Sequence, residues 1–412
     1  MKLLNAVQYL LCLGLGVMAP LFAEELPAPS SMPMGHAHEH TQSCQTQELR
    51  CANAATPALL PNGSLLLTWT AGGAVNFAKS NDGGKTFEPT VTIAQHQASL
   101  DTGGDARPQI VADAQGHVMI AYGYFKDSHW NAKVNYAVSS DFGAHFSPSH
   151  ELIDHGESER FPVLGLKHGG VVAVAWIDKR VVAQQKKAGK VVLGGSIAYT
   201  QTADWGKTFA KEVIVSPQSC ECCRIGLGIN LQGQSVLAYR AIFDGSVRDH
   251  AVQMINDQLK ASPLDRVSND HWKTDVCPHQ GPSIAISDSG ALHVTWFTQG
   301  DNRRGLYYAH TVNSGGSFSE PMKIGHEGGN PSRAYVASSR DTLWMVWKEF
   351  DGVSSTLWLM HSKDQGESWS PMEALMSTQG YSDHPLLVEG PDQIYVSWLT
   401  RQDGYQLRAL GR

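Results

Sequence analysis

An eight-residue pattern that returns along the chain is the feature that most constrains its fold. Residues 80–87 read Ser-Asn-Asp-Gly-Gly-Lys-Thr-Phe, and the pattern Ser/Thr-x-Asp-x-Gly-x-x-aromatic returns at residues 139–146, 202–209 and 362–369. A fifth copy, residues 311–318, has Asn313 in place of the acid. Short Ser and Asp side chains accept backbone N–H bonds, and Gly adopts positive φ. Each copy therefore predicts a tight connection between two antiparallel strands, with the closing aromatic residue packed between sheets.

A second period counts the repeated units. Each row of the sequence has an extended apolar segment, a Gly-containing turn, and a second strand that ends in one large aromatic residue. These aromatic residues are Trp69, Tyr122, Trp176, Tyr239, Trp296, Trp347 and Trp398. Their spacing of about fifty residues suits four short strands and their turns, which is one blade of a β-propeller. The sequence predicts an all-β fold: a seven-bladed β-propeller of four-stranded antiparallel blades.

Two rows depart from the pattern. The fourth row, around Tyr239, lacks the eight-residue repeat, and the seventh row, around Trp398, ends after its third strand. We expect residues 45–51 to supply the missing outer strand beside residues 405–410 and so to close the ring.

The eight-residue pattern resembles the Asp-box of the sialidase (bacterial neuraminidase repeat) superfamily, and the resemblance in repeat form spans roughly residues 52–412. The resemblance implies a β-propeller in which the box marks the fold and lies away from the ligand site. The sialidase enzymes have six blades. A six-bladed sialidase-type propeller is therefore the alternative to the seven blades counted here.

The N-terminal segment is typical of an exported protein. Residues 1–23 carry Lys2, an apolar run and then Ala23, which predicts a signal peptide and a periplasmic or secreted protein. An uncleaved membrane anchor is the alternative, and no membrane span is expected after signal cleavage. Residues 24–44 are predicted to form a flexible Met-, His- and Pro-rich tail, and residues 45–412 the propeller. The tail either carries no ligand or binds copper through Met32, Met34, His36, His38 and His40.

The first residues of the inner strands are expected to face the mouth of the central channel, where propellers bind ligands. In four rows this opening carries an arginine, namely Arg107, Arg160, Arg224 and Arg333, and the seventh row has His384. The net charge of −7 and the lack of a basic cluster argue against nucleic acid as a partner. The predicted partner is a small-molecule, glycan or metal ligand at the channel mouth.

The six cysteines outside the signal segment are Cys44, Cys51, Cys220, Cys222, Cys223 and Cys277. An even count in an exported chain suggests disulfides, and Cys44 with Cys51 is one expected pair. Cys220, Cys222 and Cys223 open the fourth inner strand, while Cys277 and His279 open the fifth, so adjacent blades bring the five residues together. They form either disulfides, with Cys277 bonded to Cys222 or Cys223, or a thiolate and imidazole site for copper or zinc.

The sialidase resemblance also implies candidate catalytic residues. The family holds the sugar carboxylate with three arginines, whose guanidinium groups meet a carboxylate bidentately, and uses a Tyr nucleophile. Residues 160–164 resemble the family's first Arg motif, which matches Arg160, and Arg224 and Arg333 are candidates by their equivalent row positions. Tyr381, followed by Ser382, resembles the motif that contains the nucleophile.

The family's acid/base Asp has no counterpart at the expected place. Residues 181–203 contain no Asp or Glu, and Glu159 and Glu349 are the candidate substitutes. General-acid assistance is worth roughly 10²–10⁴-fold in rate, so its loss would weaken glycosidic bond cleavage severely. The leading interpretation is therefore a binding protein whose ligand lies at the channel mouth, with a metal such as copper among the candidate ligands. An exo-alpha-sialidase or related glycoside hydrolase is the alternative.

Overall fold

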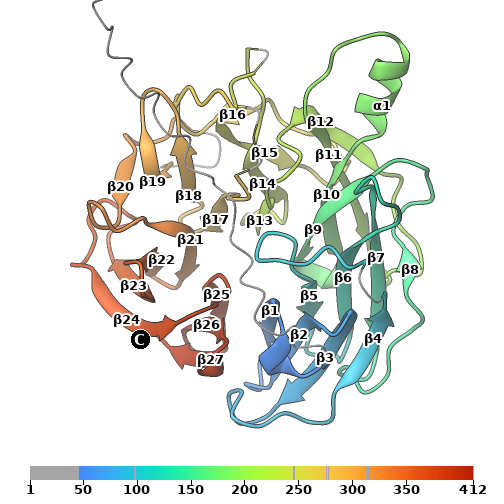
Figure 1. Cartoon of the computed structure of the whole chain (residues 1–412), viewed down its shortest axis with the longest axis vertical. Coiled ribbons are helices and arrows are strands. Elements are labelled where there is room, and N and C mark those ends of the chain that lie inside the picture. The colour runs from blue at the N-terminus through green and yellow to red at the C-terminus, as the bar shows by residue number, and fades with distance from the viewer. Residues whose placement is uncertain are drawn as a thin grey trace, which may run out of the picture. The chain divides into compact units, whose positions relative to one another are not determined.

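The computed structural model describes residues 46–96, 99–244, 246–274, 276, 278–311 and 316–411. Its strands form seven antiparallel sheets arranged as the blades of a ring, which confirms the predicted seven-bladed β-propeller (Figure 1). Six sheets have four strands each and the seventh has three. In every sheet the strands are hydrogen-bonded in chain order, so each blade is a simple meander.

The strand bounds follow the seven rows of the sequence. Blades 1 and 2 are β1 (Ala54–Leu59), β2 (Leu65–Ala71), β3 (Ala74–Ser80), β4 (Val91–Gln95), β5 (Gln109–Ala112), β6 (Val118–Phe125), β7 (Ala132–Ser139) and β8 (His150–Glu151). Blades 3 and 4 are β9 (Glu159–Leu166), β10 (Val172–Asp178), β11 (Gly195–Thr202), β12 (Val213–Ser219), β13 (Gly226–Ile229), β14 (Ser235–Arg240), β15 (His250–Ile255) and β16 (Asp265–Arg266). Blades 5, 6 and 7 are β17 (Ser283–Ile286), β18 (Leu292–Gln299), β19 (Arg304–His310), β20 (Met322–Ile324), β21 (Ser332–Ser339), β22 (Thr342–Phe350), β23 (Ser354–Ser362), β24 (Glu373–Gln379), β25 (Leu386–Glu389), β26 (Ile394–Thr400) and β27 (Gly404–Ala409).

The seven marker aromatics all lie on the second strand of a blade and are all buried. A buried indole N–H needs a hydrogen-bond acceptor, and the chain supplies one locally. Trp176 Nε1 donates to Asp178 at 3.0 Å, and Trp347 Nε1 donates to Glu349 at 2.8 Å, in both cases two residues further along the chain. Each blade therefore buries one of the regularly spaced aromatic residues in its core.

The eight-residue turns share one geometry at the four copies that are fully described. In the first copy Gly84 N donates to Ser80 Oγ at 2.8 Å, and Thr86 N donates to Asp82 Oδ1 at 2.9 Å. The equivalent bonds recur at residues 139–146, 202–209 and 362–369. Hydrogen bonds from Thr86 and Ser80 lower the pKa of Asp82 to about 2. The turns thus use Ser/Thr and Asp as backbone acceptors, as the sequence predicts.

The turn also joins each blade to the one before it. The fifth residue of the pattern, for example Gly143 at φ +87°, lies against an aromatic ring on the third strand of the preceding blade. The closing aromatic packs edge-on against the same ring, with Phe146 and Phe77 centroids 5.1 Å apart and those of Phe209 and Tyr136 also 5.1 Å apart. A side chain at Gly143 would meet Phe77, so both the φ and the contact require glycine.

The ring closes through blades 1 and 7, but not through the strand predicted for residues 45–51. Residues 49–51 of this segment form a 3₁₀ helix, η1 (Leu49–Cys51), so the predicted strand is wrong, although η1 does contact β27 as its predicted position requires. Leu49 and Tyr405 pack with the core of blade 1, and Arg401 donates to the carbonyl of Arg50 at 2.8 Å. Side-chain packing and carbonyl acceptors therefore hold this seam, rather than the ladder of a fourth strand.

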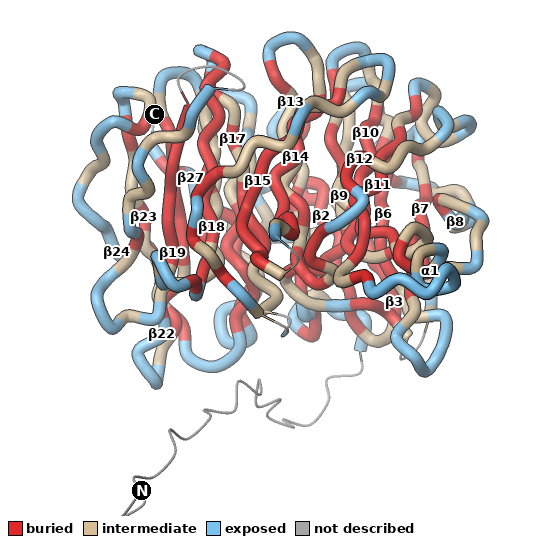
Figure 2. Tube along the Cα trace, turned by 90° about the horizontal axis from the view of Figure 1, so that it is seen from above, coloured by how far each residue is buried: buried red, intermediate tan, exposed pale blue. Residues whose placement is uncertain are grey.

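One helix lies outside the predicted pattern. α1 (Arg180–Lys187) follows β10 and occupies the segment where the sialidase family keeps its acid. A one-turn 3₁₀ helix, η3 (His168–Gly170), connects β9 to β10. None of the described helices has the length and apolar character that a membrane crossing needs. Figure 2 shows that burial follows the strands and that the connecting loops are exposed.

Candidate functional site

The mouth of the channel gathers the arginines that the sequence predicts there. Arg107 and Arg224 lie two residues before the first residues of β5 and β13, and Arg160 and Arg333 are the second residues of β9 and β21. The inner strands contact one another in order around the ring, including β1 with β25. The four guanidinium groups consequently approach one face from four different blades.

Asp105 supplies a carboxylate to two of these arginines. Its Oδ1 lies 2.7 Å from Arg224 Nη1 and 3.9 Å from Arg333 Nη1. His384 Nδ1 is 3.7 Å away, and Gly281 N donates to Oδ2 at 3.2 Å. Burial lowers the pKa of His384, so its imidazole is neutral near pH 7 and the positive charge comes from the arginines. The Asp105 carboxylate is thus bound by groups from blades 4 and 5, and groups from blades 6 and 7 lie close to it.

Arg160 has a carboxylate of its own. Asp101 accepts two bonds from it, at 2.7 Å to Nε and 2.9 Å to Nη2. Arg224 and Arg333 therefore converge on Asp105, whereas Arg160 is held by a neighbouring acid of the same loop. The guanidinium of Arg160 also lies over the Phe125 ring, 5.1 Å from its centroid, and Phe125 contacts the 72% exposed Trp130.

Arg107 has a structural position at the seam of the ring. It is buried, pairs with Asp383 at 2.7 Å and donates to the carbonyl of Ala55 at 2.9 Å. Asp383 also accepts from the backbone N–H of Ala55 at 3.0 Å. The group joins blades 1, 2 and 7 and leaves Arg107 little surface for a ligand.

Positive charge exceeds negative charge at this mouth. Lys348 adds an ammonium group that donates to the carbonyl and hydroxyl of Ser382, and burial lowers its pKa to about 8. The acids that contact these cations are Asp101, Asp105 and Asp383. Five cations, the four arginines and Lys348, against three carboxylates leave two positive charges near pH 7. Such an excess in a concave, low-dielectric setting attracts anions.

A cavity of about 270 Å³ lies along the channel beside this cluster. Its walls are residues of the inner strands, among them Thr56, Gln109, Leu227 and Leu387. Asp105, Arg107 and Arg224 also contribute to the wall. The Asp105 carboxylate and the cations around it therefore lie between the mouth and the interior of the channel.

Tyr381 lies at the rim and is 45% exposed. Its hydroxyl donates to the carbonyl of Asn53, and its ring is 5.9 Å from the Arg401 guanidinium. Burial of the hydroxyl and nearby Asp383 raise its pKa, which leaves the phenol protonated and a weak nucleophile.

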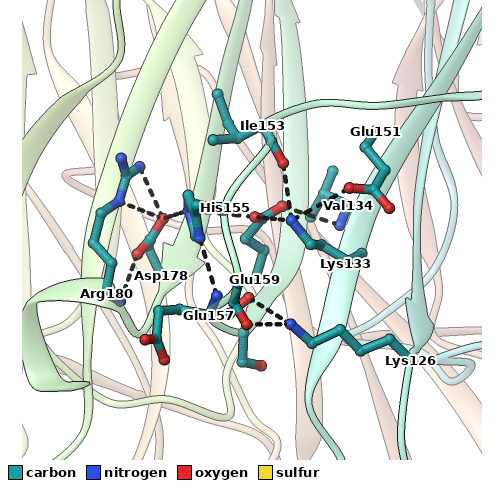
Figure 3. Close-up of polar contacts among 12 residues, drawn as sticks. Lys126, Lys133, Val134, Glu151, Ile153, His155, Glu157, Glu159, Asp178 and Arg180 are labelled. Atoms are coloured by element: carbon teal, nitrogen blue, oxygen red, sulfur yellow. Dashed lines mark hydrogen bonds and ion pairs between the residues drawn. The ribbon is translucent and has the colours of Figure 1, made fainter.

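Glu159 belongs to a buried polar network, shown in Figure 3. It accepts from Lys133 at 3.2 Å, and His155 lies between it and Asp178, with Nε2 at 3.3 Å and 3.2 Å from the two acids. Arg180 at the start of α1 also binds Asp178. Burial raises the pKa of Glu159, but its side chain is fully enclosed, so it has no access to a ligand.

Glu349, the other candidate acid, is similarly engaged. It accepts from Trp347 Nε1 and from His326 N at 2.9 Å, and it pairs with the His326 ring at 2.9 Å. Both candidate acids therefore serve the packing of a blade.

The cysteine cluster assembles as the sequence predicts for its first three members. Cys220, Cys222 and Cys223 are buried, and their sulfur atoms all lie within 4.8 Å of one another. Cys220 Sγ is 3.4 Å from Cys222 Sγ and 3.9 Å from Cys223 Sγ, much longer than the ~2.05 Å of a disulfide bond. Three sulfur ligands at this spacing suit a thiophilic metal ion.

The other predicted ligands are placed differently. His279 lies beside Arg333, which donates to its carbonyl, and its ring is 6.3 Å from that of Phe161. Within the described part of the chain, the group close enough to share an ion consists of the three cysteines alone. Cys277, Cys44 and the Met- and His-rich tail lie outside the described residues, so their predicted roles, including the Cys44–Cys51 pairing, stay predictions.

No pattern in the sequence marks several residues of the site. Asp105, Trp130 and Lys348 come from a loop between blades, a loop within a blade and the end of a second strand. An exposed tryptophan in a loop is the one feature that a closer inspection of the sequence would single out.

Comparisons with known proteins agree on the fold. No protein-family model matches the chain, and no curated protein matches it by sequence. Among solved structures, an ulvan lyase of the polysaccharide lyase family PL25, bound to -[GlcA(1-4)Rha3S]-, is 11% identical with a TM-score of 0.57, covering 87% of this chain and 94% of its own. The polysaccharide lyase Uly1 is 9% identical with a TM-score of 0.50, covering 87% and 88%. The intramolecular trans-sialidase from Ruminococcus gnavus is 12% identical with a TM-score of 0.46, covering 87% and 94%. At these identities the two lyases, with TM-scores of 0.57 and 0.50, show that the chain shares their fold and no more.

Proposed function

We propose that this protein is an exported propeller that binds a carboxylate-bearing saccharide at the channel mouth. The observation that carries the proposal is the excess of two positive charges beside the half-buried Phe125 ring and the exposed Trp130 ring. Guanidinium groups bind carboxylates bidentately, and an aromatic face provides apolar surface for a sugar ring. Asp101 and Asp105 already illustrate the geometry in which these arginines hold a carboxylate.

The binding surface in this proposal consists of Arg160, Arg333, Phe125 and Trp130. Arg160 and Arg333 retain 20% and 14% of their side-chain surface, whereas Arg107 retains 4%. Arg224 and His384, deeper in the cluster, position Asp105 and through it Arg333.

Calorimetric titration with an oligogalacturonate and with a neutral cello-oligosaccharide of equal length tests the proposal. We expect binding of the acidic oligosaccharide only, weakened about 10- to 100-fold by Arg160→Ala because a charge-assisted hydrogen bond is lost. Arg340→Ala is the matched control, since Arg340 is exposed on the β21–β22 turn and only loosely paired with Asp392. Equal affinity for both oligosaccharides would refute the proposal.

A sialidase activity is the alternative that the resemblance implies. Two of its three candidate arginines converge on Asp105, which occupies the position that a substrate carboxylate would need. Turnover of a fluorogenic sialoside that Tyr381→Phe abolishes would replace the binding proposal with this one. We expect no turnover, because Tyr381 is protonated and both candidate acids, Glu159 and Glu349, are engaged in the blades.

A second function, metal binding, is favoured by the three clustered thiols. We propose that Cys220, Cys222 and Cys223 bind a soft ion such as copper or zinc, with Cys277 as the further candidate ligand from the adjacent blade. Mass spectrometry of protein purified from the periplasm tests this by counting free thiols and bound metal together. If all of these cysteines form disulfide bonds, the cluster has a structural role and does not bind metal.

A further inference from the structure

Two buried arginines surround the thiol cluster without a carboxylate partner. Arg240 and Arg248 are 1% and 6% exposed, and within the described residues neither forms an ion pair with an acid. Arg240 donates through Nη2 to the carbonyls of Gln280 and Phe297, at 3.0 and 3.1 Å, while its Nε and Nη1 have no hydrogen-bond partner. Arg248 Nε also has none. A buried guanidinium normally has an anion beside it, because its desolvation is otherwise uncompensated.

The anions within reach of these arginines are the thiol sulfurs. Arg248 Nη1 lies 3.7 Å from Cys220 Sγ. Arg240 is the next neighbour, since the backbone N–H of Cys220 donates to the carbonyl of Arg240 at 2.8 Å. Arg248 therefore contacts the cluster from the segment that leads into β15, and Arg240 borders the cluster from the end of β14.

A third group beside the cluster is equally without a partner. His250, paired with Arg240 across the β14–β15 ladder, is buried, and neither of its ring nitrogens has a hydrogen-bond partner among the residues that the structure describes. The wall of the cluster thus consists of two cations and one imidazole, which together suit a negatively charged occupant.

We propose that the thiol cluster binds a monovalent soft cation, Cu(I), as a three-coordinate thiolate complex whose charge is balanced by Arg240 and Arg248. The inference rests on the metal-binding function proposed above and specifies its ion. Three thiolates and Cu(I) carry a net charge of −2, and the two guanidinium groups carry +2. Three thiolates with Zn(II) carry −1, which leaves one positive charge buried, and structural Zn(II) sites almost always have four ligands.

The spacing of the sulfurs agrees with such a complex. An ion bonded to three coplanar sulfurs at about 2.3 Å holds them about 4 Å apart. The Cys220 sulfur is already 3.4 Å from Cys222 Sγ and 3.9 Å from Cys223 Sγ. Binding therefore requires only small side-chain adjustments.

Anaerobic titration of the reduced full-length protein with Cu(I) against a competing chelator, and with Zn(II) in parallel, tests the ion. We expect one Cu(I) per chain that a Cys222→Ser, Cys223→Ser double variant does not bind, and X-ray absorption that shows three sulfur ligands for that ion. The double variant also serves as the blank for copper held elsewhere in the chain, including its Met- and His-rich segment.

Arginine variants test the charge balance. Arg248→Gln is expected to weaken Cu(I) about 10- to 100-fold, the cost of one charge-assisted contact, and to leave Zn(II) affinity unchanged or higher. Arg304→Gln, at an exposed position on β19, is the control. Arg248→Lys, which keeps the charge, is expected to retain more of the Cu(I) affinity and covers the case in which Arg248→Gln fails to fold.

The outcomes separate the two proposals. Failure of both ions to bind, or cysteines that are disulfide-bonded in the native protein, would overturn metal binding itself. Binding of Zn(II) in preference to Cu(I), or Cu(I) affinity that is insensitive to Arg248 in both variants, would leave metal binding standing and overturn the charge-balanced monovalent site.

Discussion

At the scale of single residues, the channel mouth is organised by charges that come from distant parts of the sequence. Asp105 is 119 residues from Arg224, to which it is hydrogen-bonded, and farther still from Arg333 and His384. Its burial means that the two arginines depend on it for charge compensation. Lys348 lies in the same cluster with a pKa close to neutrality. Substitutions at Asp105 and at Lys348 are therefore expected to have separate, measurable effects.

Replacing Asp105 should destabilise the protein and leave a site beside Arg224 and Arg333 that a small carboxylate can occupy. We expect Asp105→Ala to lower the free energy of unfolding by about 3–5 kcal/mol, because removing one partner of a buried pair leaves charge uncompensated. Added formate or acetate should restore part of the loss, measured by the rise of the melting temperature with carboxylate concentration. Asp392→Ala, which removes an exposed partner of Arg340, should cost at most about 1 kcal/mol and show no such rescue. An Asp105→Ala variant as stable as the parent would show that the arginines do not need this acid.

Lys348 should give ligand binding a pH dependence. Its pKa of about 8 means that it is charged below and neutral above that value, so affinity for an acidic oligosaccharide should fall as the pH rises through 8. Lys348→Arg should remove this fall, since guanidinium stays charged throughout the range. Lys348→Met should bind more weakly at pH 7 and also show no step. A step that persists in both variants would assign the titration to another group.

At the scale of elements, the repeated turn is a connector between blades as well as a link between strands. Its Ser/Thr and Asp side chains bind the turn's own backbone, and its glycine and closing aromatic contact the preceding blade. The local bonds explain why the pattern is recognisable from sequence. The contact with the neighbouring blade explains why glycine occupies the fifth position.

Two glycine substitutions separate these roles. Gly143→Ala should cost about 2–4 kcal/mol, because a Cβ there would lie 2.2 Å from the Phe77 ring and the residue has φ +87°. Gly83→Ala, also in a turn and at φ +75° but with no atom near its Cβ, should cost only the backbone strain of about 1–2 kcal/mol. Denaturant unfolding measures both. Equal losses would mean that the turn does not need its contact with the preceding blade.

At the scale of the whole molecule, the seam between blades 1 and 7 is held by the same kind of contact as the other junctions. Phe87 of the first turn packs edge-on against Tyr405 at 6.0 Å, as Phe209 does against Tyr136 within the ring. Arg107 and Asp383 add a buried ion pair across the seam. The ring should therefore respond to damage at the seam as it does to damage elsewhere.

Tyr405→Ala and Tyr136→Ala test this equivalence. Each variant loses the edge-on contact with a closing aromatic residue and one hydrogen bond, and Tyr136→Ala also loses a ring contact with His150. Each should therefore lower the free energy of unfolding by about 3–5 kcal/mol. Denaturant unfolding should show similar losses in single cooperative transitions. A much smaller loss for Tyr405→Ala would mean that the seam is effectively open.

The sequence by itself determined the repeat, its period and the number of blades, because these depend on local chemistry: hydrogen bonds within a turn and one buried aromatic per second strand. It also placed four arginines and three cysteines at inner-strand openings, since equivalent positions in equivalent blades lie together. It did not predict that residues 49–51 form a 3₁₀ helix and not a strand, because side-chain packing against Tyr405 decides the conformation of that edge. Only the tertiary structure decided that Asp105 binds Arg224 and lies close to Arg333, that Phe125 contacts both Arg160 and Trp130, and that Arg248 contacts the Cys220 sulfur. These contacts join loops and strands far apart in the chain, and no local pattern of residues encodes them.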